Sequence, residues 1–263
     1  MSVTFERRGS TALLTLNSPA TRNAFTDEIR QGLADGIAQA RASADIRALV
    51  ITGSGGVLCA GGDIRGMACA FAVNDGAAWR SRMHGTQRWM AELLTLDKPV
   101  IAAVDGPAYG AGFSVALAAD FVLASPRARF CLSFMKLGLV PDCGAFYTLP
   151  RVVGAQRAKE LMLSAREVGA QEAKDLGIAM ELHEVDALLP RALALAASFE
   201  GASPLAVSLI KRAMFNPGEL AAQLDGEANA QALAFGSGYT ADAVQRFLDK
   251  QTPAFAWPTW PKE

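Results

Sequence analysis

The sequence predicts an α/β protein with mostly parallel strands, and three observations support that prediction. Short apolar runs of strand length alternate with helical patterns through the first half of the 263-residue chain. Hydrophobic residues make up 51% of the chain and charged residues only 19%, which is enough apolar material for one sizeable core. After about Val152 the pattern becomes mainly helical. Strands separated by helices form layered sheets in which neighbouring strands run parallel.

The strands of the first half are predicted from runs that are apolar, short and bounded by polar or turn residues. These runs cover residues 11–17, 47–52, 99–104 and 121–124. A helix is expected over residues 27–42, where Ile29, Leu33 and Ile37 recur at helical spacing and Thr26 can cap the first turn. Further helices are expected over residues 77–96 and 112–119.

Six more helices are expected in the second half. They cover residues 155–163, 170–177, 185–197, 204–214, 219–235 and 241–250. The late helices are rich in alanine and broadly apolar, whereas a helix on the surface of a monomer has a single apolar stripe. We therefore expect them to pack on something beyond their own small bundle, and burial against another subunit is one hypothesis.

The composition argues against several functional classes. A net charge of −1 and a pI of about 6.2 disfavour nucleic acid as a partner. No stretch approaches the roughly 20 apolar residues of a membrane span, and the first residues lack the apolar run of a secretory signal. The four cysteines show no CxxC spacing and the two histidines lie far apart. We therefore expect no metal site, and free thiols in a reducing cytoplasm.

Two segments, 57–64 and 106–113, share one design: a buried strand, then a turn of very small residues, then a helix. Small residues allow a ligand to approach the backbone, and a helix N-terminus offers unpaired N–H donors. Two such turns that face one point would form an oxyanion hole, which stabilises a carbonyl oxygen as it gains negative charge. For either turn alone, close packing of a helix on a strand is the simpler interpretation.

Four segments together resemble the crotonase (enoyl-CoA hydratase/isomerase) superfamily, and the likeness extends over about residues 3 to 255. These segments are residues 22–25, 59–64, 106–112 and 137–144. The resemblance implies a crotonase-like spiral of ββα units over residues 1–200. It also implies a C-terminal helical region over residues 201–263 that assembles homotrimers or dimers of trimers. The implied ligand is an acyl-CoA thioester, with coenzyme A as part of the substrate and no separate cofactor.

The resemblance also assigns site residues. The oxyanion donors fall on Gly62 and Ala111. The residues that would line the path of coenzyme A are Arg22, Ala24, Ala60, Gly61, Asp63, Ile64, Arg65, Phe247 and Lys250. Each has a simpler interpretation: Asp63 as a cap of its turn, Arg65 as a solvated charge, and Lys250 as a helix-end cation. Because coenzyme A is a polyanion, a nearly neutral chain needs such cations locally.

The sequence departs from the hydratases, which add water to an enoyl thioester with two glutamates. Those positions fall on Ser114 and Phe134, and neither side chain can act as a general base. Asp142 remains, in a segment (136–144) that resembles isomerases of unsaturated CoA thioesters in phenylacetate and fatty-acid breakdown. One carboxylate can move a proton from C2 to C4 in a Δ3-to-Δ2 double-bond shift, and apolar neighbours would raise its pKa. The alternative is that Asp142 caps a helix that begins near Cys143.

Other functions remain open from the sequence. One is another crotonase reaction, such as enoyl-CoA hydration, thioester hydrolysis or decarboxylation. Another is a non-catalytic CoA-binding paralogue. A serine hydrolase built from Ser114, Asp142 and His183 is disfavoured, because Ser114 is expected inside a helix rather than at a sharp turn after a strand. Acyl specificity is expected to depend on a loop over residues 64–79. The apolar residues in and after it could set substrate size, or could equally form a core stripe; they are Met67, Phe71, Trp79, Met83 and Trp89.

Overall fold

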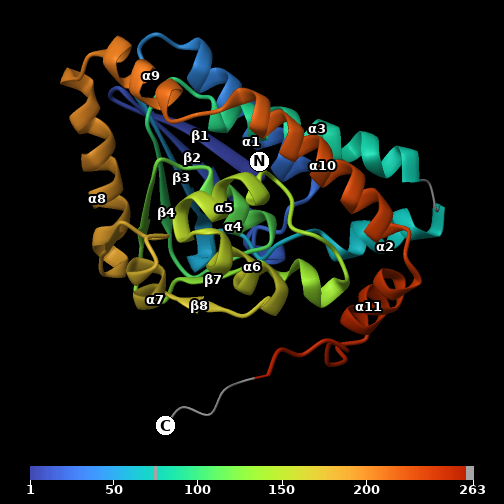
Figure 1. Ribbon diagram of the computed structural model, residues 1–263. Coiled ribbons are helices and arrows are strands. Elements are labelled where there is room, and N and C mark those ends of the chain that lie inside the picture. Colours follow the sequence, from blue (N-terminus) through green and yellow to red (C-terminus); the bar gives the residue numbers. More distant parts are fainter. Residues whose placement is uncertain (74–75, 259–263) are drawn as a thin grey trace.

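The computed structural model describes residues 1–73 and 76–258, with a six-stranded sheet at its centre (Figure 1). The strand order is β1-β2-β3-β4-β6-β9. The first hairpin is antiparallel, and every later neighbour pair in this sheet is parallel, as predicted. The strands are β1 (Val3–Arg8), β2 (Thr11–Leu16), β3 (Ala48–Gly53), β4 (Val100–Val104), β6 (Phe121–Ala124) and β9 (Glu181–Leu182).

A second, three-stranded sheet has the order β5-β7-β8. β5 pairs with β7 in parallel and β7 pairs with β8 antiparallel. These short strands are β5 (Pro107–Tyr109), β7 (Arg129–Cys131) and β8 (Val168–Gly169). Because β5 directly follows β4 in the chain, the small sheet positions the residues that leave the carboxyl end of the large one.

Nine helices match the sequence-based expectations, with boundaries that shift by a few residues, whereas no range was predicted for the helices over residues 64–73 and 145–153. In the first half they are α1 (Asp27–Ala42), α2 (Ile64–Val73), α3 (Gly76–Leu94), α4 (Ala111–Leu117) and α5 (Ala145–Val153). In the second half they are α6 (Ala155–Ser164), α7 (Ala170–Asp175), α8 (Val185–Ser198), α9 (Pro204–Ala213), α10 (Pro217–Phe235) and α11 (Gly238–Leu248). Short 3-10 helices are η1 (Pro19–Thr21), η2 (Ser54–Gly56), η3 (Ser133–Leu137) and η4 (Phe199–Gly201).

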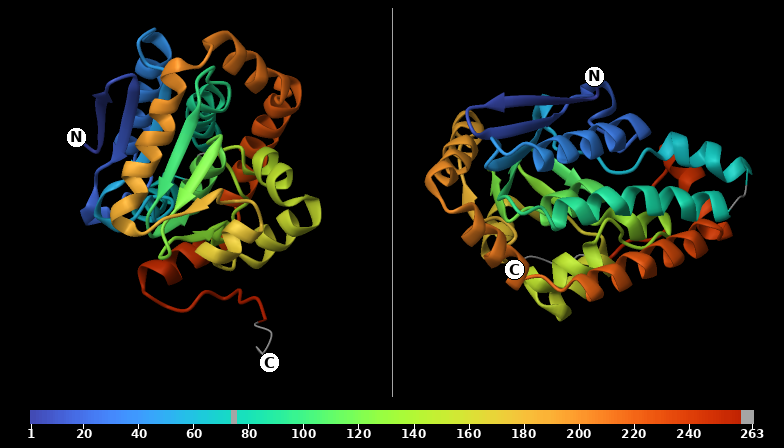
Figure 2. Two further views of the ribbon diagram at one scale, coloured as in Figure 1. Left: turned by 90° about the vertical axis from the view of Figure 1, so that its left-hand side faces the viewer. Right: turned by 90° about the horizontal axis from the view of Figure 1, so that it is seen from above.

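The large sheet is covered on both faces, which explains its nearly continuous apolar strands. Successive side chains of a strand point to opposite faces, so Leu14 and Ile51 pack in one cluster with Leu33 of α1, whereas Leu13 and Val50 pack in another with α8. Figure 2 shows α8 lying across one side of the sheet. The six-stranded sheet is therefore a central layer, with α1 and α3 on one face and α8 on the other.

The C-terminal helices fold back onto the first half of the chain. In Figures 1 and 2, α10 runs alongside α3. Phe235 of α10 stacks on Trp79 of α3, with ring centroids 3.7 Å apart, and the Gln87 side chain donates a hydrogen bond to the carbonyl oxygen of Leu224. α11 packs on α2. The expected packing of late helices on something beyond their own bundle is thus observed within one chain for α10 and α11.

The segment between the first turn and Trp79 differs from the expected loop. Residues 64–73 form helix α2, and α3 begins at Gly76, one residue before the predicted start. The Asp63 carboxylate accepts a hydrogen bond from the Gly66 N–H at 3.1 Å, which is the contact of an N-terminal cap and explains why a helix starts here. The side chain of Phe71 lies outside the described residues.

Among the described residues, no single helix is long and apolar enough to cross a bilayer. The segments Val185–Gly201 and Pro204–Ala213 are long and apolar enough only when taken together, and they meet at an angle of 111°. The apolar face of α8 packs on the sheet, where Leu188, Ala192 and Ala196 are buried. The described residues also contain no cluster of His, Cys, Asp or Glu that could hold a metal ion.

The turn after β4 depends on a glycine that a larger residue cannot replace. Gly106 has a φ of +75°, and a Cβ there would lie 2.0 Å from the carbonyl oxygen of Gly56. Gly9 has a similar φ of +62° with nothing within 4 Å. We expect Gly106→Ala to lower the free energy of unfolding by about 3 kcal/mol or more, and Gly9→Ala by about 1 kcal/mol. Urea unfolding of both variants would measure the difference, and equal losses would contradict the role of this close contact.

Candidate active site

The two glycine-rich turns follow the carboxyl ends of neighbouring parallel strands, β3 and β4. The segments that lead into them run side by side, with Cys59 and Ala108 paired in a parallel bridge. The Tyr109 N–H donates to the carbonyl oxygen of Cys59 at 2.9 Å. A Cβ on Gly112 would lie 2.5 Å from the Cβ of Cys59. The second turn can therefore approach the first only because residue 112 has no side chain.

Most backbone N–H groups around the two turns already have acceptors. The Gly61 N–H donates to the Sγ of Cys59 at 3.4 Å, and the Gly110 N–H donates to a carbonyl oxygen of β7 at 2.8 Å. In the described part of the chain, the N–H groups of Gly62 and Ala111 donate to no protein acceptor. Each turn thus has a free donor at the position that the sequence analysis assigned to the oxyanion hole.

Cys59 lies between the two turns and is fully buried. Burial raises the pKa of its thiol to about 12, so the thiol stays protonated at neutral pH and is a poor nucleophile. Its sulfur instead accepts the N–H of Gly61. The residue therefore helps to hold the two turns together.

A third segment pairs with the first turn and brings several predicted site residues together. The Phe25 N–H donates to the carbonyl oxygen of Gly61 at 2.8 Å, and the Ala60 N–H donates to that of Arg22 at 3.0 Å. Ala24 lies between these two contacts. Arg22 and Ala24, which were predicted to line the path of coenzyme A, are thus neighbours of the predicted oxyanion turn.

Asn23, within this third segment, is a structural turn residue. It is fully buried and has a φ of +55°. Its Oδ1 accepts the Ser18 N–H at 2.7 Å, and its Nδ2 donates to the carbonyl oxygens of Val57 at 2.7 Å and Ser54 at 3.1 Å. All of these bonds hold the first turn in place, which leaves no polar atom of Asn23 for a ligand.

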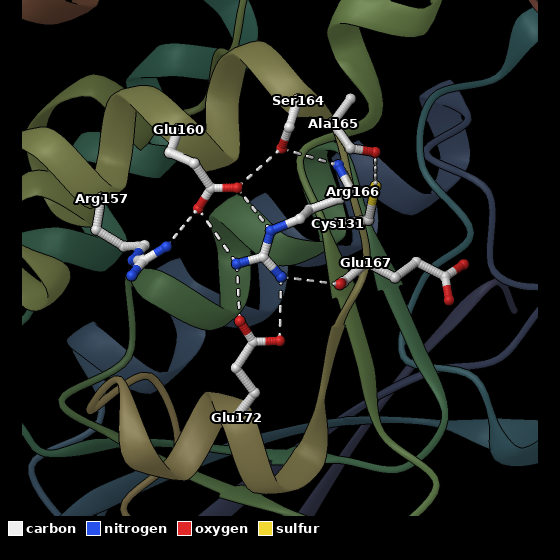
Figure 3. Close-up of polar contacts among 8 residues, drawn as sticks. All are labelled: Cys131, Arg157, Glu160, Ser164, Ala165, Arg166, Glu167 and Glu172. Atoms are coloured by element: carbon white, nitrogen blue, oxygen red, sulfur yellow. Dashed lines mark hydrogen bonds and ion pairs between the residues drawn. The ribbon is translucent and has the colours of Figure 1, made fainter. Parts of the chain in front are cut away.

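A charged network lies beside β7, the strand that pairs with the second turn (Figure 3). Arg166 makes paired contacts with Glu160 and Glu172, with the nearest N–O distances of 2.6 Å and 2.7 Å. The adjacent Ala165 carbonyl accepts a hydrogen bond from the Sγ of Cys131 at 3.2 Å. Cys131 lies in β7, the strand whose carbonyl accepts the N–H before Ala111. The network therefore fixes the neighbour of the second turn rather than contacting a ligand.

Asp142 lies between η3 and α5 and is 9% exposed. The Nε2 of Gln231 donates to its Oδ2 at 2.9 Å, and its Oδ1 has no hydrogen-bond partner among the described residues. Burial raises the pKa of this carboxyl to about 6, although interactions with the Cys143 thiol and the Gln231 amide oppose the rise. The next residue, Cys143, belongs to the same buried cluster as Ala111, and helix α5, which begins three residues after Asp142, contacts helix α4, which begins at Ala111.

The capping alternative for Asp142 is wrong. Helix α5 begins at Ala145, and its first N–H groups are held by Glu227 of α10. The Glu227 carboxylate accepts the Gly144 N–H at 2.9 Å and the Phe146 N–H at 3.2 Å. Burial and the nearby Asp142 raise the pKa of Glu227 to about 8.

Glu227 and Gln231 were missed by the sequence analysis. They are 1% and 2% exposed, four residues apart, on the face of α10 that also buries Leu224 and Phe235. A polar pair at helical spacing within an apolar face was the available signal. It was not used, because the alanine-rich composition of the helix hides which face is buried.

The structure does not assemble a serine-hydrolase triad. Ser114 lies inside α4 and its Oγ donates to the carbonyl oxygen of Gly110 at 3.4 Å, as expected for a back-bonded helix serine. His183 contacts Glu181 at 2.6 Å, and Asp142 is bonded to Gln231. Each member of the supposed triad thus has another partner.

The thiol beside the candidate base is not a nucleophile either. Burial raises the pKa of Cys143 well above its ordinary value, and the charges of Asp142 and Glu227 raise it further. The residue is 1% exposed. Cys143 is therefore a buried core residue beside Asp142.

The remaining predicted contacts of coenzyme A lie further out. Asp63 caps α2, which was its simpler interpretation, and Ile64 and Arg65 begin that helix. Phe247 and Lys250 are exposed, at the end of α11 and just after it. α11 packs on α2, which places both groups on neighbouring elements, but no direct contact joins them among the described residues.

The fold and the paired turns define a class of protein that comparison with known sequences identifies. The chain belongs to the enoyl-CoA hydratase/isomerase family, whose model matches residues 6–257. The chain is similar to the 1,2-epoxyphenylacetyl-CoA isomerase of Escherichia coli (strain K12), with 37% identity over 247 residues that cover 92% of this chain and 93% of the relative.

Two further comparisons agree with that membership. The 2,3-dehydroadipyl-CoA hydratase of Escherichia coli (strain K12) is 35% identical and covers 95% of this chain and 96% of its own length. The crystal structure of an enoyl-CoA hydratase/isomerase from Cupriavidus metallidurans CH34 matches with a TM-score of 0.77 at 42% identity, over 99% of this chain and 98% of that one. The relatives thus include both an isomerase and a hydratase.

The buried carboxyl of Asp142 should cost stability at neutral pH. The native state holds its proton up to about pH 6, whereas an unfolded chain releases it near 3.8, so this group makes stability fall as the pH rises between those values. We expect Asp142→Asn to be more stable than the wild type at pH 7.5, by up to about 3 kcal/mol. Urea unfolding at several pH values measures this.

The matched control for that measurement is Asp175→Asn. Asp175 also accepts a hydrogen bond from a glutamine, Gln171, but it is exposed. We expect this variant to show no gain in stability between pH 4 and pH 7.5. A gain of equal size in both variants would contradict burial as the cause.

Proposed function

We propose that this protein isomerises enoyl-CoA thioesters by moving a double bond from Δ3 to Δ2, with Asp142 as the acid–base residue. The observations that carry the proposal are two free backbone donors on adjacent turns and one buried carboxyl with an unpartnered oxygen, just before a helix (α5) that contacts α4 of the second turn. The family membership supports the thioester class, and the similarity to an isomerase of a phenylacetyl-CoA derivative supports the reaction type.

The oxyanion half of the proposed mechanism depends on Gly62 and Ala111. The thioester oxygen accepts both free N–H groups. Removal of a proton from C2 shifts the electron pair toward that oxygen and gives a dienolate. Donors that are already oriented stabilise this charge without reorganisation, which accounts for a large part of such rate enhancements.

The proton-transfer half depends on Asp142. Its Oδ1 takes the proton from C2, and the same carboxylic acid returns it to C4 as the double bond forms between C2 and C3. The reaction needs no net proton from solvent. A pKa of about 6 suits a group that must first accept and then donate a proton near neutral pH.

Hydration is less well supported, because the site lacks a second free carboxylate. Ser114 and Phe134 occupy the positions of the hydratase glutamates. Glu227 is close enough to Asp142 for the Asp142 charge to raise the pKa of Glu227, but both oxygens of Glu227 accept backbone N–H groups, those of Gly144 and Phe146. Glu227 is therefore not available to position a water molecule.

For coenzyme A itself, we propose the path along Arg22, Ala24 and Ala60, past Gly61 and Asp63, to Ile64 and Arg65. Arg22, Arg65 and Lys250 are exposed, and none of them has an ion-pair partner among the described residues. Free cations of this kind suit the phosphates of the ligand. Phe247, on the helix α11 that packs on α2, and Lys250, just after it, are candidate late contacts, either in the same chain or in a neighbouring subunit.

We also propose assembly into a homotrimer or a dimer of trimers. α9 exposes four large apolar side chains, which a monomer rarely leaves in water. They are Leu205, Leu209, Ile210 and Met214, between 56% and 82% exposed. The cytoplasmic location and the absence of a separate cofactor stay predictions from the sequence.

The proposed reaction is tested by incubating the protein separately with 3-enoyl-CoA and 2-enoyl-CoA and identifying the products by mass spectrometry and chromatography. We expect 2-enoyl-CoA from the first substrate. Asp142→Asn should lower kcat by about 10²–10⁴-fold, because the base is lost while the hydrogen bond from Gln231 can persist. Turnover unchanged in that variant would overturn the proposal, and hydrated product from 2-enoyl-CoA would favour hydration.

The oxyanion role is tested by removing a single N–H group. Ala111→Pro deletes the free donor at the first position of α4, where proline is tolerated, and should lower kcat by about 10²–10³-fold. Ala155→Pro is a matched control, because Ala155 also begins a helix after a glycine of positive φ. We expect the control to retain activity. Equal loss in both variants would indicate general damage to the helix rather than loss of an oxyanion donor.

A further inference from the structure

Gln231 makes two hydrogen bonds with the same nitrogen. Its Nε2 donates to the carbonyl oxygen of Val140 at 2.8 Å and to the Oδ2 of Asp142 at 2.9 Å. Both partners are acceptors, so the orientation of the amide is fixed by the contacts themselves. The side chain is 2% exposed. A buried glutamine has thus joined α10 to the segment that carries the candidate base.

We propose that Gln231 is a positioning residue for the proposed reaction: its amide holds Oδ2 of Asp142 and leaves Oδ1 as the oxygen that exchanges the proton. This inference rests on the proposed function. It adds a residue from the C-terminal helices to the proposed oxyanion and acid–base groups, which are Gly62, Ala111 and Asp142.

A carboxyl group in this place needs such a constraint. Rotation about its last bond exchanges the two oxygens, and only one of them can face the substrate at a time. A bond to Oδ2 selects one orientation, and the second bond to Val140 prevents the amide from following the carboxyl if it rotates. Reacting atoms held in the right geometry react far faster than the same atoms left free to turn.

Gln231 can act in this way because α10 is itself held on both sides. One turn earlier, Glu227 binds the N–H groups of Gly144 and Phe146, just beyond Asp142 in the chain. One turn later, Phe235 stacks on Trp79 of α3. The amide is therefore presented from a fixed helix face rather than from a mobile side chain.

The charged and titratable groups that face Asp142 come from three elements. They are Glu227 of α10, Cys143 beside it in the chain and Arg30 of α1. Gln231 is neutral, so its removal changes a hydrogen bond without changing the charge of the site. The hydrogen bond favours the ionised form of Asp142, and its loss should make that form harder to reach.

The first test is Gln231→Met, which keeps the length of the side chain and removes the amide. We expect kcat for 3-enoyl-CoA to fall about tenfold while KM changes less than about twofold, because the base is misoriented but substrate contacts remain. The acid limb of the kcat/KM profile should move up by about 0.5–1 pH unit. Gln171→Met is the matched control, since Gln171 makes the same kind of bond to an exposed aspartate, and it should change neither quantity.

A second variant guards against a simple failure to fold. Gln231→Glu keeps both the size and the polarity of the side chain, but adds a negative charge next to Asp142. It should move the acid limb further up than Gln231→Met does, because two neighbouring carboxylates cannot both ionise easily. A profile that is unchanged in both variants, with normal kcat, would overturn the proposal.

A measurement without turnover separates this inference from the proposed function. The carboxyl resonance of Asp142 can be followed by NMR in protein labelled with 13C-aspartate, and Asp142→Asn identifies it by its disappearance. We expect its titration to shift to higher pH in Gln231→Met and to stay in place in Gln171→Met. If the wild type does not isomerise 3-enoyl-CoA, the proposed function fails, yet this shift would still show that Gln231 holds the carboxyl. An unshifted titration would refute that hold whatever the enzyme catalyses.

Discussion

The site depends on one close backbone contact, between the segment that leaves β3 and the segment that leaves β4. Cys59 and Ala108 pair there. Gly106 and Gly112 approach the segment after β3 so closely that a Cβ on either glycine would collide with it. Because this contact fixes two turns at once, the free N–H groups of both have one relative position. The parallel strands bring the turns to the same edge of the sheet, and the missing side chains let them meet.

A second constraint acts at Asp142. Burying a carboxyl is unfavourable, and the protein tolerates it at Asp142 because one oxygen is bonded to Gln231. The same burial keeps the proton affinity of that carboxyl near neutral pH. Burial of Asp142 therefore lowers the stability of the fold while it raises the pKa that the proposed chemistry needs. The hydrogen bond from Gln231 offsets part of the cost of burial.

The sequence predicted features that depend on local pattern and failed where tertiary packing decides. The strand over 121–124 and the two small-residue turns follow from apolar runs and glycines, and the structure has them. A helix was expected after the first turn, but its extent was not predicted, because residues 64–79 were also interpreted as a loop that sets acyl specificity; in the structure residues 64–73 are helix α2. Gln231 could not be placed, because its partner Asp142 lies 89 residues away and no local pattern joins them.

The position of Gln231 on α10 also bears on how this fold can be divided and recombined. Exchanging the last helices between relatives, or cutting the chain before Pro217, looks like a change to a peripheral appendage. It would in fact remove the Gln231 amide that donates to the buried Asp142 carboxylate, and the Glu227 carboxylate that holds the start of α5. The candidate base and helix α10 therefore depend on each other. A chimaera that takes them from different parents must keep the hydrogen bonds between them.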